Sequence, residues 1–256
     1  MEKTVEKITS RSNPVCIHVK KLGASKRYRE EHGQFLCEGE KHLHEALRSG
    51  MKIECVLSAI DVSNKLPEST KVYYVKDDII DSLSTLRSSR DLLFTCKIPE
   101  VREETFKTGT HLLLDRIQDP GNVGTIIRCA HAFGLDSVIL TEGSADIYNP
   151  KTIRATMGAV FKQRVFILKH NDIYNLKCSG IRLLGTSNRA DSVDISKVSL
   201  KNVIIILGNE GQGVSKELLE ISDQIMNIPL ASDCESLNVA TAASIIMWEA
   251  RKSKSR

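Results

Sequence analysis

From residue 111 onward, short runs of apolar residues alternate with stretches that have helical spacing. Runs of this kind, rich in aliphatic and β-branched residues, are typical of strands that are buried on both faces of a parallel sheet. We therefore predict an α/β fold, with a mostly parallel sheet and helices on both faces. Ligands of such sheets bind at the carboxyl ends of the strands, so the informative loops follow Asp115, Thr186, Leu207 and Leu230. The predicted strands are 111–115, 137–141, 164–168, 181–186, 202–207 and 225–230.

Residues before 100 show shorter elements of both kinds, and a polar stretch with proline and glycine follows at 97–109. Such a stretch is typical of a linker. We predict a smaller α/β domain over 1–100, a linker over 101–109 and a second domain over 110–256. In the first domain the pattern predicts strands at 35–39, 55–60 and 72–75, and helices at 39–50 and 76–86.

The composition is that of an ordinary globular protein, with 41% hydrophobic and 27% charged residues in a chain of 256. No uncharged apolar run approaches the ~20 residues of a membrane span, and MEKTVEKITSRSNP has no apolar core for a signal peptide. The seven cysteines form no C-x-x-C pair, which argues against a disulfide framework or a zinc site. We expect a cytoplasmic protein with reduced thiols, no membrane association and no metal.

Positive charge is concentrated at the two ends of the chain. The net charge is only +4, but residues 1–29 hold eight basic side chains against two acidic ones, and the C-terminus reads RKSKSR. Clustered lysine and arginine attract phosphate backbones. A solvated, poorly ordered terminus is the alternative, and composition leaves both interpretations open.

The loop GNEGQG (208–213) joins a predicted strand to a helical segment over 215–220. A Walker loop would need lysine where Val214 stands, and the glycines do not follow the dinucleotide pattern G-x-G-x-x-G. The carboxylate of Glu210 would also repel a pyrophosphate. Glycine lets the backbone approach a ligand closely, and a carboxylate suits a cationic or hydroxyl-bearing ligand, such as the sulfonium of S-adenosylmethionine. The alternative is a tight turn that binds nothing.

Two further stretches place polar residues beside predicted strands. In LLLDRIQDPGNVGTIIRCAHAFG (112–134), DPGN is a turn, Asn122 is a candidate helix N-cap, and Arg128 follows six residues later. In IPLASDCESLNVATAASIIMWEARK (228–252), a helix of small apolar residues opens near Ser236 and Asn238, and we expect it to be buried, for example against another subunit. Taken singly, these features have ordinary interpretations: a turn, a surface arginine and a helix cap.

Together, and in this order, the three stretches resemble the three motifs of the SpoU/TrmH family of RNA ribose 2′-O-methyltransferases, in the SPOUT superfamily. The matches are N-x-G-x-x-x-R at 122–128, G-N-E-G-x-G at 208–213 and I-P-L…S-L-N-V at 228–239. NPKTIRATMGAVF (149–161) is similar to this family as well. The N-terminal part, ITSRSNPVCIHVKKL to EGEKHLHEAL, resembles the ribosomal-protein-like substrate-binding domain of rRNA-directed members. Relatives often carry a Pro-Gln-Gly-type tract where this chain reads SSRDLLFTC (88–96), which leaves the RNA target open.

The resemblance implies a C-terminal trefoil knot, a bound S-adenosylmethionine and methyl transfer to a ribose 2′-oxygen. It assigns Arg128, supplied across a homodimer interface, to the transfer. Because the pKa of arginine is ~12 or above, we expect Arg128 to bind a phosphate and stabilise the developing alkoxide rather than to act as an ordinary base. Asn122 would hold Arg128 or the RNA, Ser236 and Asn238 would contact phosphate or ribose, and Glu210 would orient the loop. The residues expected to line the cofactor are Thr186, Leu207, Gly208, Ile228, Leu230 and Leu237.

The partner implied by the resemblance is RNA, and the N-terminal domain favours large-subunit ribosomal RNA over transfer RNA. The alternatives are a tRNA-directed methyltransferase and a non-catalytic RNA- or ribosome-binding protein that retains the fold. Loss of Arg128 or Glu210 would mark the non-catalytic case, and both residues are present. The candidate RNA-binding residues are Arg11, Lys20, Lys21, Lys26, Arg27 and Arg29.

Other reactive side chains carry less weight. His42 and His44 lie two positions apart in a predicted helix, so they do not share a helical face and a metal pair is not expected. Cys234 has no histidine near it in the sequence, and transfer to ribose needs no covalent intermediate. Neither site enters the functional hypothesis.

Overall fold

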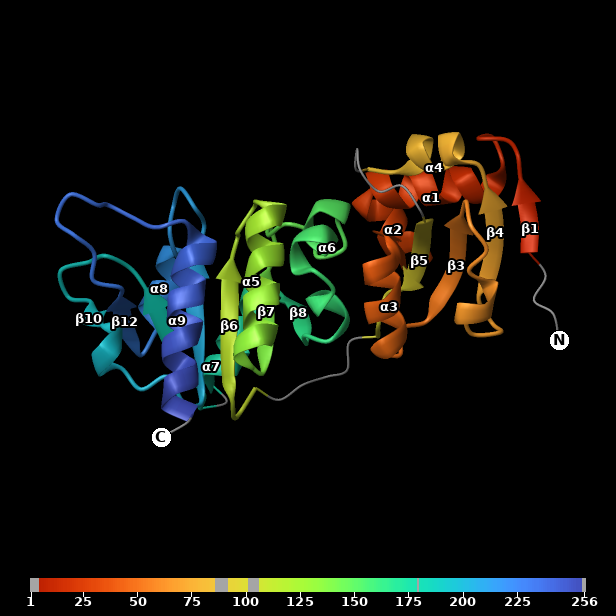
Figure 1. Ribbon diagram of the computed structural model, residues 1–256. Helices are drawn as coiled ribbons and strands as arrows, with labels where there is room; N and C mark the ends of the chain where they lie inside the picture. Colours follow the sequence, from red (N-terminus) through yellow and green to blue (C-terminus); the bar gives the residue numbers. More distant parts are fainter. Residues whose placement is uncertain (1–4, 86–91, 101–105, 179, 255–256) are drawn as a thin grey trace. The chain divides into compact units, whose positions relative to one another are not determined.

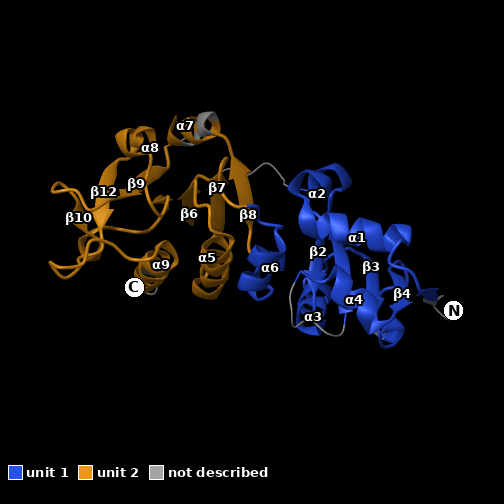
Figure 2. Ribbon diagram, turned by 90° about the horizontal axis from the view of Figure 1, so that it is seen from above, with its two compact units in different colours: residues 1–100, 146–161 blue, residues 101–145, 162–256 orange. Residues whose placement is uncertain are grey.

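The computed structural model describes residues 5–85, 92–100, 106–178 and 180–254, and the chain divides into two compact units (Figure 2). Unit 1 comprises residues 1–100 and 146–161, and unit 2 comprises residues 101–145 and 162–256. Residues 106–109 of the expected linker lie in the described part, as do residues 92–96 of the SSRDLLFTC stretch. Within these ranges, every helix is too short or too polar to span a bilayer.

Unit 1 is built on a five-stranded sheet in the order β1-β4-β3-β5-β2. The strands β1, β4 and β3 run parallel, whereas β5 is antiparallel to both of its neighbours. Side chains alternate between the faces of a strand, so Leu36 of β2 packs with α1 and α4, while Phe35 and Cys37 pack with α3. The elements are β1 (Val5–Ile8), α1 (Pro14–Ala24), α2 (Lys26–His32), β2 (Gln34–Glu38), α3 (Glu40–Arg48), β3 (Ile53–Ser58), η1 (Ser63–Lys65), β4 (Lys71–Val75), α4 (Asp77–Leu83) and β5 (Leu92–Lys97).

The helices α1 and α2 were not predicted, although their ends carry ordinary signals. The side chain of Asn13 accepts a hydrogen bond from the Val15 amide at 2.9 Å, and Pro14 occupies the first helical position. The helix α2 begins after Ser25, whose side chain caps it, and ends at Gly33 in the left-handed conformation (φ 60°). These two helices carry most of the basic residues of the N-terminal segment.

Residues 146–161 lie between two strands of unit 2 in the sequence but pack with unit 1. They form α6 (Pro150–Thr156) and η2 (Ala159–Phe161). Ile153 and Phe161 belong to the same apolar cluster as Phe35, and the rings of Phe161 and Phe35 are 6.4 Å apart. The domain division expected from the sequence placed this segment with residues 110–256, whereas its contacts are with the first hundred residues.

A buried ion pair also fixes this segment. Asp146 Oδ2 accepts from Arg29 Nε at 3.0 Å and from Arg29 Nη2 at 2.5 Å, and Arg29 Nη1 donates to the Leu22 carbonyl. In the same segment, the pKa of the Tyr148 hydroxyl is raised to about 12, mainly by burial and secondly by the nearby Asp146 carboxylate. Arg29 is only 3% exposed. The expectation that Arg29 contacts RNA is therefore wrong, because its guanidinium is enclosed and donates to groups inside the unit.

Unit 2 contains a seven-stranded sheet in the order β10-β12-β9-β11-β6-β7-β8, in which every pair is parallel. The predicted fold class and the predicted strands are confirmed, except that the last strand ends at Asn227 and residues 228–230 continue as a loop. The strands are β6 (Thr110–Asp115), β7 (Ser137–Thr141), β8 (Val165–Leu168), β9 (Arg182–Thr186), β10 (Val193–Asp194), β11 (Val203–Gly208) and β12 (Gln224–Asn227).

Helices cover both faces of this sheet. The helices α5 (Pro120–Phe133) and α9 (Val239–Lys254) pack side by side on one face (Figure 1). The helices α7 (His170–Cys178) and α8 (Lys216–Ile221) lie on the other face (Figure 2). The short η3 (Ile195–Lys197) follows β10. Strands β6 and β11 are buried almost throughout, so the core of unit 2 lies around the middle of the sheet. The trefoil knot stays a prediction.

Candidate active site

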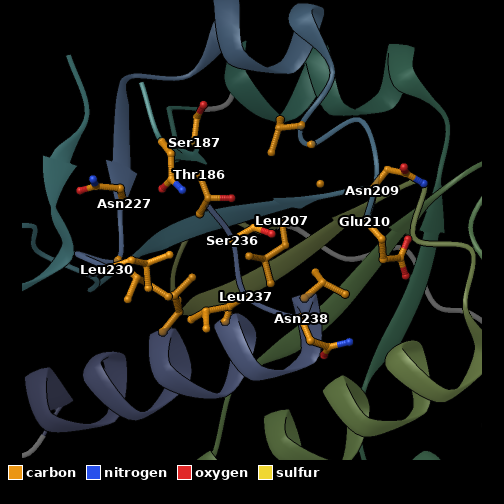
Figure 3. A pocket seen from close by; sticks show the side chains of 18 of the residues that line it. Thr186, Ser187, Leu207, Asn209, Glu210, Asn227, Leu230, Ser236, Leu237 and Asn238 are labelled. Atoms are coloured by element: carbon orange, nitrogen blue, oxygen red, sulfur yellow. The ribbon is translucent and has the colours of Figure 1, made fainter. Parts of the chain in front are cut away.

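A cavity of about 590 Å³ opens where β9, β11 and β12 end. Because these strands are parallel neighbours, their carboxyl ends and following loops meet at one edge of the sheet. Figure 3 shows Leu207 and Leu237 near the middle of the cavity, with Glu210 and Asn238 on one side of it. All six residues predicted to hold the cofactor line this cavity: Thr186, Leu207, Gly208, Ile228, Leu230 and Leu237.

The glycine loop folds back on itself at one side of the cavity. Asn209 and Gly213 form an isolated antiparallel bridge, with N–O distances of 3.0 and 2.8 Å. A Cβ atom on Gly208 would lie 1.9 Å from the Val214 amide nitrogen and 2.0 Å from the Gly213 carbonyl carbon, so only glycine fits there. Gly213 has φ 69°, which favours glycine as well.

Val214 explains why this loop is not a phosphate loop. Its side chain is 7% exposed and packs in the apolar core of unit 2 with Ile204, Ile206 and Leu218. A lysine at this position would bury its ammonium among aliphatic side chains, which is costly for an unpaired charge. The residue that departs from the Walker pattern therefore anchors the loop to the sheet.

Polar contacts fix the loop from its outer side, and sequence reasoning missed them. Asn209 Nδ2 donates to the Arg116 carbonyl at 2.8 Å, and Asn209 Oδ1 accepts from the amides of Gly211 and Gln212 at 2.9 and 3.1 Å. The fully buried carboxylate of Asp115, at the end of β6, accepts from the Ser215 amide at 2.8 Å. The position of Asp115 at the carboxyl end of a predicted strand was the available signal.

Three predicted catalytic residues form one hydrogen-bonded row. Asn122 Nδ2 donates to Glu210 Oε1 at 2.9 Å, and Asn238 Nδ2 donates to Asn122 Oδ1 at 3.1 Å. The row joins the first turn of α5, the glycine loop and the start of α9. Ser236, Asn238 and Glu210 also line the cavity. The structure thus joins three of the five predicted catalytic residues in one row and places a fourth, Ser236, in the lining of the same cavity.

The N-cap of α5 is Asp119 and not Asn122, so that prediction is wrong. The Asp119 side chain accepts from the Asn122 amide at 2.7 Å, and Pro120 occupies the first helical position. Proline is favoured at this position because its fixed φ suits the first turn. The side-chain amide of Asn122 is therefore available to bond with Glu210 and Asn238. Asn238 itself caps α9, because its side chain accepts a hydrogen bond from the Ala240 amide at 2.9 Å.

Arg128 is the predicted catalytic residue that neither lines the cavity nor belongs to the polar row. It is exposed on α5, and its side chain makes no hydrogen bond or ion pair with any residue in the described ranges. Six helical positions amount to about 600° of rotation, so the side chains of Asn122 and Arg128 leave the helix about 120° apart. Within one chain, Arg128 points away from the polar row.

The basic residues of unit 1 differ in how much of their charge is free. Arg11 pairs with Asp78, Lys26 with Glu30 and Arg27 with Glu31, all at the surface. Lys20 and Lys21 are exposed and have no acidic partner among the described residues. Five of the six predicted RNA-binding residues therefore stay at the surface, and the two lysines of α1 carry the unpaired charge.

His42, His44 and Cys234 do not form a second catalytic site. His42 Nδ1 donates to the Glu38 carbonyl, and His44 pairs with Glu40 on the same helix. Cys234 is exposed, and its Sγ contacts the Ser236 carbonyl at 3.5 Å. The described part of the chain contains no cluster of three or more histidine, cysteine, aspartate or glutamate residues placed to hold a metal ion.

Comparisons with known proteins agree with this geometry. Residues 109–248 match the model of the SpoU rRNA Methylase family, and residues 13–93 match that of the MRM3-like substrate binding domain. The chain is 34% identical over 254 residues to a 23S rRNA (guanosine(2553)-2′-O)-methyltransferase of Bacillus subtilis (strain 168), covering 96% of this chain and 100% of that protein.

Solved structures give the same result. The S-adenosylmethionine-bound rRNA methyltransferase from Sinorhizobium meliloti is 29% identical and superposes with a TM-score of 0.88, covering 97% of this chain and 98% of the other. The SpoU methyltransferase AviRb from Streptomyces viridochromogenes, in complex with the same cofactor, is 23% identical with a TM-score of 0.84. It covers 94% of this chain and 98% of its own, and at this identity the likeness concerns the fold.

Proposed function

The chain belongs to the SpoU rRNA Methylase family, and on that premise we propose that it methylates a ribose 2′-hydroxyl of large-subunit ribosomal RNA. Membership confirms the resemblance seen in the motifs, the enzyme class of RNA 2′-O-methyltransferase and S-adenosylmethionine as the cofactor. The choice of large-subunit RNA is supported by the 23S rRNA substrate in the name of the Bacillus subtilis relative. A cytoplasmic location is part of the same proposal.

One observation carries the proposal: the six residues expected to hold the cofactor line a single cavity, and the polar row lies at its rim. The cavity has the size of an ordinary small-molecule site. Leu207, Leu230 and Leu237 offer apolar surface to an adenine ring, and Gly208 leaves backbone exposed where any side chain would collide. The carboxylate of Glu210 suits a cationic ligand. The residues therefore fit S-adenosylmethionine, which supplies an electrophilic methyl group when bound.

The polar row would position the ribose and its phosphate. Asn122 is held between Glu210 and Asn238, so its orientation is fixed before RNA binds. Preorganised polar groups lower the cost of reaching the transition state because they need no rearrangement. Ser236, which lines the same cavity and precedes Asn238 by two residues, would contact phosphate or ribose.

Arg128 would act from a second copy of the chain. It is exposed and turned away from Asn122 on its own helix, yet the family motif includes both residues. In a homodimer formed through α5 and α9, Arg128 of one copy could reach the polar row of the other. Its guanidinium stays protonated because its pKa is ~12 or above, so it cannot accept the 2′-proton. It would bind the adjacent phosphate and stabilise the negative charge that develops on the 2′-oxygen as the proton passes to water.

Exposed apolar side chains on α9 support this homodimer. Trp248 is 51% exposed and Ile245 is 38% exposed, while Ala243, Ile246 and Met247 are buried within unit 2. Trp248 meets Phe133 of α5 edge to face, with ring centroids 6.0 Å apart. A large aromatic side chain of this exposure is typical of an interface. We expected α9 to be buried, and one side of this helix is buried within its own unit.

Transfer of a labelled methyl group tests the proposal. The protein is incubated with methyl-labelled S-adenosylmethionine and total RNA, and the RNA is digested to nucleosides. We expect the label in a 2′-O-methylnucleoside from large-subunit ribosomal RNA. Label in a base or in transfer RNA would contradict the proposal. Calorimetry with S-adenosylmethionine alone excludes the non-catalytic alternative if it gives a saturable heat.

A further inference from the structure

Three aromatic rings meet on the surface of unit 1 where α1, α2 and β2 adjoin. The rings of Tyr28 and His32 are stacked, with centroids 3.9 Å apart and an interplanar angle of 26°. The ring of His18 lies 5.6 Å from Tyr28 and 5.3 Å from His32. Tyr28 and His18 are half-buried, and Tyr28 packs against the apolar core between α1, α4 and the sheet, whereas His32 is exposed.

The exposed ring of His32 is held in place from two sides. Its Nδ1 donates to the Tyr28 carbonyl at 3.0 Å, and its face stacks on the Tyr28 ring. Tyr28 is fixed in turn by His18, whose Nε2 donates to Gln34 Oε1 at 3.1 Å and whose Nδ1 lies 3.0 Å from the Tyr28 hydroxyl. An exposed ring fixed in this way loses little conformational entropy when another ring stacks on it.

The ammonium of Lys21 lies beside these rings. Lys21 Nζ is 5.4 Å from the centroid of Tyr28, and Lys20 is its neighbour on α1. Ile17, one turn earlier on this helix, is 42% exposed. Among the other exposed basic residues described in the N-terminal segment, Arg11, Lys26 and Arg27 pair with acidic residues, and Lys7 lies over the ring of Tyr74. The surface thus combines a preorganised ring, an apolar side chain and the cation of Lys21, with Lys20 preceding Lys21 on the same helix.

We propose that the surface formed by Lys20, Lys21, Tyr28 and His32 binds an unpaired nucleotide of the RNA substrate. The base stacks on His32, and the adjoining phosphates contact the two lysines. Stacking on an exposed aromatic ring requires a base that is not stacked in a duplex, and single-stranded segments offer such bases. This inference rests on the proposed function and deepens it, because it states which form of RNA unit 1 recognises and through which residues.

Fluorescence anisotropy with the full chain tests the stacking contact. The probes are a labelled 12-nucleotide single-stranded RNA of mixed sequence and a 12-base-pair RNA duplex. We expect His32→Ala to weaken binding of the single strand about 5- to 10-fold, at the lower end of the range for loss of one stacked base. Binding of the duplex should change less than about twofold. His32→Phe should restore binding of the single strand, because phenylalanine keeps the aromatic face.

Two further measurements separate stacking from charge and from a structural role. Lys20→Gln and Lys21→Gln should each lower the slope of log Kd against log salt by about 0.7 per lost phosphate contact, whereas His32→Ala should leave the slope unchanged. Both His32→Ala and His32→Phe remove the hydrogen bond to the Tyr28 carbonyl, so both should lower the midpoint of urea unfolding, although only the first should weaken RNA binding. His44→Ala is the matched control, since His44 is an exposed helical histidine of unit 1 whose one ion pair within the described ranges is with Glu40 on its own helix.

Three results would overturn the inference: equal affinities of His32→Ala and His44→Ala for the single strand, an equal loss on the duplex, or failure of His32→Phe to restore binding. If the wild-type chain bound neither RNA probe, the inference would also fail, and a protein partner would be favoured for this surface. Failure of the proposed function is distinguishable, because it would show as absence of methyl transfer by the wild-type chain while the His32-dependent binding of single-stranded RNA persists.

Discussion

The two units of this protein place their polar side chains in different ways. In unit 2, Asn122, Glu210 and Asn238 come from three separate elements and bond to one another at the rim of a cavity. In unit 1, the surface cations of α1 and α2 are solvated, and Arg27 pairs with a residue four positions away on its own helix. Methyl transfer needs fixed distances between reacting atoms, whereas capture of RNA is dominated by charge that tolerates movement. Unit 2 therefore suits the reaction and unit 1 suits recognition.

Substitution of Arg128 by alanine should have the largest effect. We expect methyl transfer to fall at least about 1,000-fold, because the developing alkoxide loses its stabilising charge. The affinity for S-adenosylmethionine, measured by calorimetry, should stay within about twofold, since Arg128 does not line the cavity. Arg128→Lys should recover only part of the activity, because lysine lacks the planar fork of the guanidinium. Turnover comparable to the wild type would remove Arg128 from the reaction.

Substitution of Arg29, the buried arginine of unit 1, should lower the free energy of unfolding without removing a surface charge that attracts RNA. Arg29→Ala leaves the Asp146 carboxylate buried without its partner, so we expect a loss of about 3 kcal/mol or more in the free energy of unfolding. Arg27→Ala, which removes an exposed pair, should cost less than about 1 kcal/mol. Urea unfolding followed by circular dichroism measures both. Equal losses in the free energy of unfolding for Arg29→Ala and Arg27→Ala would refute the distinction between the buried and the exposed arginine.

The glycine loop gives a matched pair of variants within one site. Gly208→Ala would place its Cβ 1.9 Å from the Val214 nitrogen, so the loop must rearrange. We expect the affinity for S-adenosylmethionine to fall about 100-fold, which is comparable to the cost of forcing an extra group into a packed region. In Gly211→Ala the nearest atom is 3.7 Å away, an ordinary contact, and affinity should change less than about threefold. Similar losses in both would mean that the loop does not shape the cofactor site.

Substitutions in the polar row should have smaller effects on the rate of methyl transfer, and these effects should not be additive. Asn122→Ala and Glu210→Ala should each lower kcat about tenfold, and the double variant should lose less than the product of the two. We expect a coupling energy of about 1 kcal/mol, as for residues in one hydrogen-bond network. The same cycle with Lys20→Gln in place of Glu210→Ala should be additive, because Lys20 belongs to the other unit. Additivity of Asn122 and Glu210 would show that the bond between them does not assist catalysis.

The lining of the cavity could be predicted because the signals are local. Apolar runs such as 203–207 mark buried parallel strands, and parallel neighbours bring their carboxyl ends to one edge. The motifs then locate Gly208 at the end of a strand and Ile228 and Leu237 in loops at that edge, and all three line the cavity. The cap of α5 was mistaken although Asp119 and Pro120 carried the usual N-cap and first-turn preferences.

Contacts between distant parts of the chain could not be predicted in this way. Arg29 was assigned to the RNA surface because its neighbours in the sequence are basic, but its partner, Asp146, lies 117 positions further along the chain. Periodicity and charge runs report on neighbours within a few residues. For the same reason the sequence did not reveal that residues 146–161 pack with unit 1, or that Asn209 anchors the glycine loop on the Arg116 carbonyl.

Ribose-methylation mapping of total RNA tests the central claim most directly. RNA is compared from cells that contain the protein, cells that lack it, and cells that contain only the Arg128→Ala variant. We expect one 2′-O-methylated position in large-subunit ribosomal RNA to be present in the first and absent in the other two. An unchanged map in cells without the protein, or full methylation by the variant, would contradict the account.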